Sequence, residues 1–162
     1  AIIEAVRTRA WNGISGNLMV ETVDTCVEEA TRGDRLQRGY VEVTAQDLER
    51  IRAVHSVDKT QESALILEIP DAEGLHGGER RLYAHALAQL AQSDSDWVVC
   101  SPDKAAIRVA IGLGWDERVI SLQKLIDESG AKLSDPLDNQ FTERWLSRYR
   151  TEYLLERERG DL

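Results

Sequence analysis

Short apolar runs alternate with amphipathic stretches along this chain. Trp97–Cys100 is an apolar run of the kind found in a strand buried on both faces. Ser101-Pro102-Asp103 supplies a hydroxyl cap, a proline and an acid, which predict a helix start. Apolar residues from Ala105 to Leu113 then predict a largely buried helix. Asp103 therefore lies where a buried strand passes into a helix, the end of a parallel sheet at which ligands gather.

The alternation continues on both sides of this stretch. Gln61–Glu68 fits a strand or a helix, and we favour a helix, whereas Pro70–Gly78 has the composition of a loop. Alternating strands and helices predict an α/β fold with a mostly parallel sheet. The other strands are expected at 18–20, 40–43 and 118–120, and the other helices at 1–13 or 1–16, 22–32, 44–54, 79–92 and 122–129.

A polar segment containing Pro136 separates residues 1–130, the predicted α/β domain, from a last helix. This helix is expected over Phe141–Arg159, and its aromatic residues, including Trp145 and Tyr149, recur every three or four positions. Such a stripe packs on the body of the domain or on another copy of the chain, and we favour the first. Residues 131–162 are thus expected to be a linker and an amphipathic helix.

Charge and length restrict the function. The chain has 162 residues and a net charge of −9, which argues against a broad nucleic-acid-binding surface but not against an enzyme that holds its substrate through a divalent metal. No apolar run approaches the roughly 18–20 residues needed to cross a bilayer, so we expect no membrane association. Cys26 and Cys100 lie in apolar contexts and are expected to be buried thiols, which favours a cytoplasmic location.

Three acids are the best candidates for chemistry. The sequence has no nucleophile elbow, phosphate-binding glycine loop or zinc-type cysteine pair, and its three histidines stand apart. Glu29, Glu79 and Asp103 come from separate segments, and hard cations such as Mg²⁺ and Mn²⁺ prefer carboxylate oxygens. The alternative is that Glu79 and Asp103 only favour helix dipoles, an effect of about 0.3–1 kcal/mol each. Spacing alone leaves both interpretations open.

The segments around these acids resemble a known family. Gly78-Glu79-Arg80-Arg81 resembles the glycine–glutamate helix start of one branch of the PIN domains, and Ser101-Pro102-Asp103 resembles their threonine/serine-x-aspartate element. Upstream, Val27–Gly33 is similar to the family's acid-bearing helix. The resemblance covers roughly residues 1–128.

The resemblance implies a fold and an activity. PIN domains are three-layer α/β/α sandwiches around a central, mostly parallel sheet, and they are metal-dependent ribonucleases that include many bacterial toxins. Carried over, Glu29, Glu79 and Asp103 would bind Mg²⁺ or Mn²⁺, and Ser101 would support the site as a catalytic hydroxyl. The family's register selects Glu29 over the neighbouring Glu28.

One feature departs from the family. PIN domains carry their first acid at the end of a first strand, whereas Ala1–Ala5 resembles the segment that comes after that motif. We expect a fragment of a longer product; the other interpretation is a degenerate member that lacks this ligand. Without that strand a sheet edge would be exposed, which favours pairing between chains and a homodimer.

The sequence supports three hypotheses. The first is a Mg²⁺- or Mn²⁺-dependent endoribonuclease acting on single-stranded RNA, in one form the toxin partner of an antitoxin. The second is an inactive PIN-like module that binds another protein through Phe141–Leu155. The third is another α/β domain, of the response-regulator or flavodoxin type; we rank it last because no paired acids come after a first strand.

Overall fold

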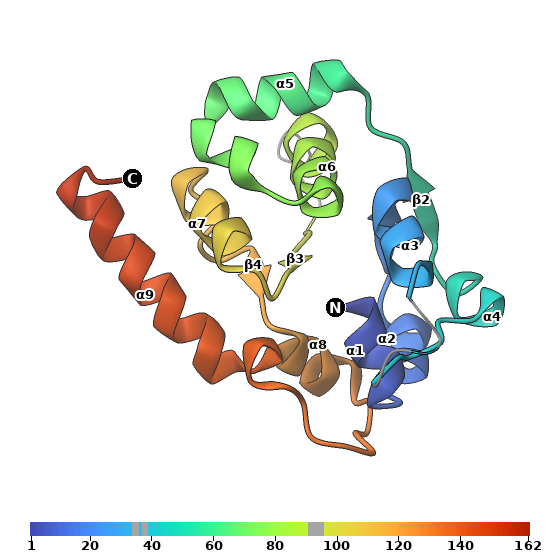
Figure 1. The fold of residues 1–162 in the computed structure, drawn as a ribbon. Helices are drawn as coiled ribbons and strands as arrows, with labels where there is room; N and C mark the ends of the chain where they lie inside the picture. The colour runs from blue at the N-terminus through green and yellow to red at the C-terminus, as the bar shows by residue number, and fades with distance from the viewer. Residues whose placement is uncertain (34–35, 37–38, 91–95) are drawn as a thin grey trace.

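The computed structural model describes residues 1–33, 36, 39–90 and 96–162, which form a mixed α/β fold (Figure 1). No helix in these ranges is both long and apolar enough to cross a membrane. The helices are α1 (Ile2–Arg7), α2 (Trp11–Asn17), α3 (Asp24–Thr31), α4 (Ala45–Leu48), α5 (Lys59–Glu68), α6 (Gly77–His85), α7 (Lys104–Gly112), α8 (Leu122–Ser129) and α9 (Glu143–Arg159). The strands are β1 (Glu21–Val23), β2 (Ala53–His55), β3 (Val99–Cys100) and β4 (Val119–Ile120), and the shorter turns are the 3₁₀ turns η1 (Pro70–Gly74) and η3 (Asn139–Phe141) and the π-helical turn η2 (Ala86–Leu90).

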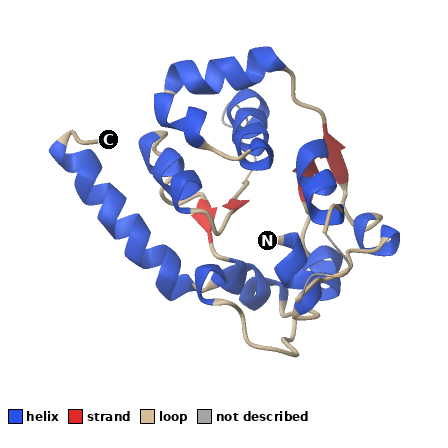
Figure 2. Ribbon diagram, viewed as in Figure 1, coloured by secondary structure: helices blue, strands red, loops and turns tan. Residues whose placement is uncertain are grey.

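The strands form two parallel pairs (Figure 2). β1 pairs with β2, with Thr22 opposite Val54, and β3 pairs with β4, with Val99 opposite Val119. Pro102 closely follows β3 and has no N–H to donate to a ladder, which helps to keep that strand short. The predicted α/β class is confirmed, but the sequence predicts one central sheet and the described residues form two small ones.

Two predicted strands are wrong. Residues 18–20 lie just before β1, which is Glu21–Val23. Tyr40–Val43 lies outside both sheets, and the strand that pairs with β1 is β2, where the sequence predicts the end of a helix. The capping box of Thr44 and Asp47 does start a helix, but α4 has only one turn. The N–H of Arg52 donates to the carbonyl of Val20 at 2.8 Å, next to the β1–β2 ladder, so pairing between strands overrides the local helical pattern.

The predicted first helix is divided into α1 and α2. The Thr8 hydroxyl donates to the carbonyl of Glu4 at 2.9 Å, and Arg9 has a φ of +60°, in the left-handed region. A left-handed residue ends a right-handed helix, so the chain turns here and α2 begins at Trp11.

Two hydrophobic clusters contain most of the buried apolar side chains. Core 1 joins β1, β3 and β4 to helices that include α5, α6, α7 and α9, and core 2 joins α1, α2 and α8. Val99 belongs to core 1 while its neighbour Cys100 packs against core 2, as expected for alternate side chains of a strand. β3 therefore has one core on each face. The buried residues that α7 gives to core 1 are Ala106, Ile107, Val109, Ala110 and Ile111.

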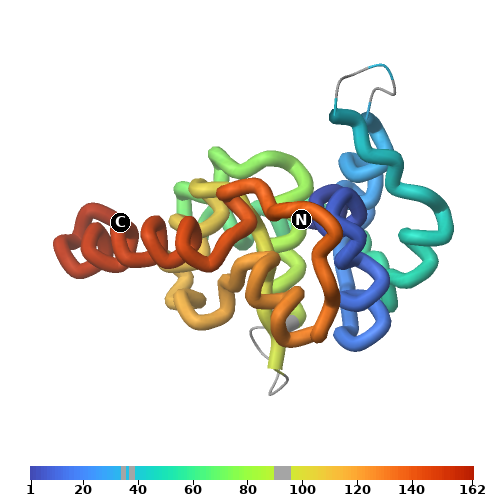
Figure 3. The backbone as a smooth tube through the Cα atoms, turned by 90° about the horizontal axis from the view of Figure 1, so that it is seen from below, coloured from blue at the N-terminus to red at the C-terminus, as the bar shows by residue number. Residues whose placement is uncertain are grey.

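The last helix packs on its own chain. α9 lies along α7, and Figure 3 shows α9 extending away from the group of helices formed by α1, α2, α3 and α4. Leu146 and Tyr153 are buried in core 1, and the Trp145 and Tyr149 rings lie 4.8 Å apart. The aromatic stripe thus contacts the body of the domain.

Core 2 is closed by contacts between the two ends of the chain. A Cβ on Gly13 would lie 2.5 Å from the Cβ of Ala131, so α2 approaches the end of α8 very closely. Asn17 Nδ2 donates to the carbonyl of Ser129 at 3.1 Å, across 112 residues. Glu4 binds Arg7 and also accepts the N–H of Asp138 at 2.8 Å. These contacts hold the first helices on the last third of the chain.

Candidate functional site

The residues predicted to carry chemistry come from segments that follow two strands. α3 begins directly after β1 and carries Glu29, while Ser101 and Asp103 directly follow β3 (Figure 1). Glu79 lies in the first turn of α6, and α6 packs on both α3 and β1. The fold therefore brings acids from three separate segments to the carboxyl ends of β1 and β3.

Ser101 links two of the acids. Its side chain is buried, and its hydroxyl donates to Oε1 of Glu79 at 3.2 Å. The backbone N–H of Asp103 donates to the same Ser101 oxygen at 3.2 Å. Ser101 thus orients the Glu79 carboxylate while fixing the start of the Asp103 turn.

Asp103 caps α7 through its side chain. Its Oδ1 accepts the N–H groups of Ala105 at 2.7 Å and Ala106 at 3.1 Å. The sequence predicts Ser101 as the cap, but α7 begins at Lys104 and Asp103 takes that place. One carboxylate oxygen of Asp103 is therefore already hydrogen-bonded to the first turn of α7.

Glu79 is in an environment that disfavours its charge. Burial raises the pKa of its carboxyl, and the negative charges of Asp103 and Glu29 raise it further; the hydrogen bond from Ser101 and the charge of His76 oppose them, and the net shift is upward. None of the ion pairs between described residues includes Glu29, Glu79 or Asp103. The three acids are thus held near each other without a lysine or arginine paired to them in the part of the chain that the structure describes.

Glu29, and not Glu28, faces α6. Oε1 of Glu29 accepts the N–H of Gly78 at 3.0 Å. A Cβ on Gly78 would lie 2.4 Å from Oε2 of Glu29, so only glycine permits this approach. Glu28 instead pairs with Arg32 at 2.7 Å on the exposed side of α3. Of these two neighbouring acids, Glu29 is therefore the one that contacts the start of α6.

Sequence reasoning missed Tyr83. It is fully buried, its hydroxyl has no hydrogen-bond partner in the structure, and burial with the nearby charges of Glu79 and Asp103 raises its pKa. An unpaired buried hydroxyl is costly unless a ligand or water completes it. Tyr83 lies four residues after Glu79, on the same face of α6, and that spacing is the signal that could have identified it.

The donor set fits a hard divalent cation only in part. Carboxylate and hydroxyl oxygens are the right ligands, and the unpaired Tyr83 hydroxyl leaves a polar atom free for a metal-bound water. However, within the described ranges no three His, Cys, Asp or Glu side chains are arranged to hold a metal ion. Glu29 and Asp103 each turn an oxygen toward a backbone N–H. A cation here would be held by one or two carboxylates and completed by water or substrate.

The two cysteines do not extend this site. Both are free and partly buried. Burial raises the pKa of the Cys26 thiol, and it raises the pKa of the Cys100 thiol to about 11. They are therefore protonated at neutral pH and are weak ligands and nucleophiles.

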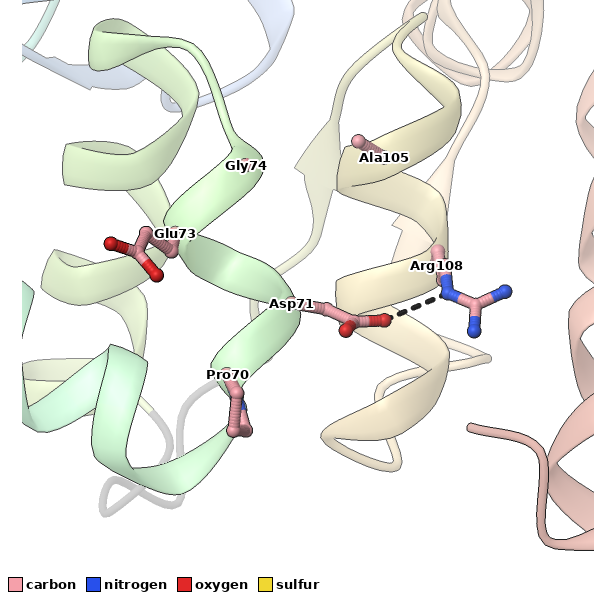
Figure 4. A pocket seen from close by; sticks show the side chains of 6 residues that line it. All are labelled: Pro70, Asp71, Glu73, Gly74, Ala105 and Arg108. Atoms are coloured by element: carbon pink, nitrogen blue, oxygen red, sulfur yellow. Dashed lines mark hydrogen bonds and ion pairs between the residues drawn. The ribbon is translucent and has the colours of Figure 1, made fainter.

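A pocket of about 530 Å³ lies between η1 and α7, and none of the three candidate acids lines it (Figure 4). Arg108 in its wall binds Asp71 at 2.8 Å and also pairs with Glu156. Because Arg108 is already paired with two acids, the pocket's described lining offers no free cation for a ligand. The candidate site is therefore the group of Glu29, Glu79 and Asp103, and not this pocket. Its lining is Pro70, Asp71, Glu73, Gly74, Ala105 and Arg108.

Comparison of the chain with family models, with curated proteins and with solved structures gives no match.

Proposed function

We propose that this protein is a Mg²⁺- or Mn²⁺-dependent endoribonuclease whose metal binds at the acids Glu29, Glu79 and Asp103, directly to one or two of the carboxylates and through water to the rest. The observation that carries the proposal is the meeting of these three carboxylates without a paired cationic side chain in the described ranges. Burial and like charge make the ionised form of Glu79 unfavourable, and a divalent cation would offset that cost.

A structural acid elsewhere in the chain shows the contrast. Glu62 is also largely buried, but Arg80 binds it at 2.8 Å and Arg81 at 3.1 Å. Although burial opposes its charge, these hydrogen bonds lower the pKa of Glu62. Among the described residues Glu79 has no such arginine partner, which supports a role for it in binding a ligand.

Each residue of the proposed centre has a distinct role. Ser101 orients Glu79, and the Tyr83 hydroxyl offers a further hydrogen bond to a water or phosphate oxygen. A cation bound here would activate water and neutralise the charge that develops on the phosphodiester. Glu29 is held ready by Gly78, so the ligands are largely pre-positioned.

The proposal includes the three-layer α/β/α arrangement of a PIN domain, in which the two strand pairs are parts of one layer. Two observations support it. β3 has core 1 on one face and core 2 on the other. In addition, the acids that follow β1 and β3 meet, so the carboxyl ends of the two pairs point to one site.

The test is Mn²⁺-dependent cleavage of a fluorescently labelled single-stranded RNA. We expect Asp103→Asn and Glu79→Gln to lower the cleavage rate by about 100-fold or more, because each removes a charge that acts on the metal and the transition state. Asn is as good a helix cap as Asp, so Asp103→Asn keeps the fold. Asp116→Asn, which changes an acid paired with Arg157, is the matched control.

Equal cleavage by wild type and Asp103→Asn would contradict the assignment. Metal binding gives a second readout, because a ligand that binds only the folded state raises the melting temperature. We expect MnCl₂ to raise the melting temperature of the wild type and of Asp116→Asn, and to leave the melting temperature of Glu79→Gln nearly unchanged.

A second candidate function is an inactive module that binds proteins by strand addition. The observation that favours it is that each strand pairs with only one other strand in the described part of the chain, and unpaired edges accept further strands. A dimer in sedimentation velocity that Val54→Lys dissociates, together with no RNA cleavage, would favour this function. Val54 is suitable because it is half exposed and lies on β2.

A further inference from the structure

Two exposed cations lie over one aromatic ring beside the acid site. Lys104 directly follows Asp103, and its Nζ lies 4.4 Å from the centre of the Tyr149 ring. The guanidinium carbon of Arg148 lies 5.4 Å from the same ring. Cation–π attraction thus holds the two charges together at the junction of α7 and α9.

These cations are not neutralised by carboxylates. No ion pair between described residues includes Lys104 or Arg148, whereas Arg108 and Arg157 on the same two helices pair with acids. Arg144 lies one turn before Arg148 and is also exposed and without an ion pair in those ranges.

We propose that Lys104, Arg144 and Arg148 form a phosphate-binding subsite that holds a single-stranded polynucleotide along the first half of α9. This inference rests on the proposed nuclease function and names the surface that its substrate occupies. The physical need is clear, because three acids at the site repel a polyanion and the attraction must come from nearby. Lys104 is adjacent to Asp103, so a strand bound on α9 would continue toward the acids.

Tyr149 positions the two cations. A hydrogen bond with Tyr149 raises the pKa of Lys104, so the ammonium stays charged across the physiological range. The Tyr149 ring is in turn fixed by Trp145 at 4.8 Å and Tyr153 at 6.2 Å, in the row of rings that packs α9 on α7. The surface is therefore built on a row of packed, at least partly buried rings.

The test measures RNA binding without cleavage. Fluorescence anisotropy of a labelled twelve-residue oligouridylate is recorded in EDTA over a series of KCl concentrations. We expect the double variant Lys104→Ala/Arg148→Ala to bind about 10-fold more weakly at 0.1 M KCl. The slope of log affinity against log KCl concentration should become shallower by about 0.7 for each lost phosphate contact. Arg159→Ala, on the same helix but paired with Asp161, is the matched control and keeps wild-type binding.

The outcomes separate this inference from the proposed function. Unchanged affinity and salt dependence in the double variant would overturn the subsite, even if the wild type cleaves RNA. Wild-type protein that does not bind the oligonucleotide, or that binds polyglutamate with the same dependence on Lys104 and Arg148, would also overturn it. Loss of RNA binding in the double variant supports the subsite, whether or not Mn²⁺-dependent cleavage is found.

Discussion

Core 1 and core 2 are stabilised in different ways. Core 1 is large and apolar: α7 is buried along most of its length, and the Trp97 and Trp115 rings pack edge to face at 5.0 Å. Core 2 has fewer buried side chains, and polar contacts add to its packing, such as the hydrogen bond from Trp11 Nε1 to the carbonyl of Asp47 at 2.9 Å. Hydrophobic burial dominates in the first cluster, and hydrogen bonds contribute a larger share in the second.

This difference bears on the acid site. Ser101 and Asp103 lie between β3 and α7, and α7 is anchored in core 1, so their positions are set by apolar packing. Glu29 lies on α3, whose one buried residue is Ala30, and it is positioned by its hydrogen bond to Gly78. We conclude that one side of the site is fixed by packing and the other by hydrogen bonding.

The largest expected effect compares equal deletions in the two cores. Ile107 of core 1 and Ile14 of core 2 are both almost fully buried. We expect Ile107→Ala to lower the free energy of unfolding by about 4 kcal/mol and Ile14→Ala by about 2–3 kcal/mol, because the smaller cluster can relax around a cavity more easily. Urea denaturation measures both values. Equal losses would contradict the distinction between the cores.

The next effect tests the polar contribution to core 2. Burial opposes the charge of Glu4, but its hydrogen bonds with Arg7 and Asp138 lower its pKa. Because the pKa is lower in the folded state, the charged carboxyl stabilises the fold at pH values above its unfolded-state pKa. This stabilisation is lost as the pH falls through the folded-state pKa. We expect Glu4→Gln to cost about 2 kcal/mol at pH 7 and progressively less as the pH is lowered toward 2.5, because the carboxylate is lost as the pH falls through its folded-state pKa.

Thermal unfolding of Glu4→Gln across this pH range is the measurement. Asp135→Asn is a useful control, because Asp135 is exposed near the same segment. A cost for Glu4→Gln that does not change with pH would mean that Glu4 acts by packing alone.

The smallest effect concerns the acid site between the cores. The pKa of Glu79 is raised, so its contribution to stability has the opposite sign: it is greatest at low pH and is lost as pH rises through the folded-state value. We therefore expect Glu79→Gln to raise the melting temperature by up to about 2 °C at pH 7 without metal, and not at pH 3.5. A lower melting temperature at pH 7 would show that the carboxylate stabilises the fold.

Local signals in the sequence predicted the second half of the fold well. The apolar run ending at Cys100, the acid and proline after it, and the Ser121 cap each specify an element within a few residues, and the structure has β3, α7 and α8 there. The first half depends on distant pairing. β2 forms because Ala53–His55 meets β1, and no local pattern distinguishes that segment from the alternating Tyr40–Val43.

The candidate site was predicted through its acids but not its environment. Glu79 and Asp103 follow local helix-start patterns, so their positions can be inferred from the sequence. The unpaired hydroxyl of Tyr83 and the row of cations on α9 depend on tertiary packing, which brings Tyr149 over the start of α7. Such contacts between remote segments have no local signature.

The docking of α1 and α2 on α8 has a consequence for folding during synthesis. The hydrogen bond between Asn17 and Ser129 joins residues that are 112 positions apart. The helices α1 and α2 therefore cannot pack on α8 until α8 has left the ribosome. At about 5–20 residues per second this delay is on the order of ten seconds. During that time Trp11 and Ile14 would remain exposed to chaperones and to other nascent chains, while core 1 also waits for α9. Translation speed between α2 and α8 is thus a determinant of the yield of folded protein.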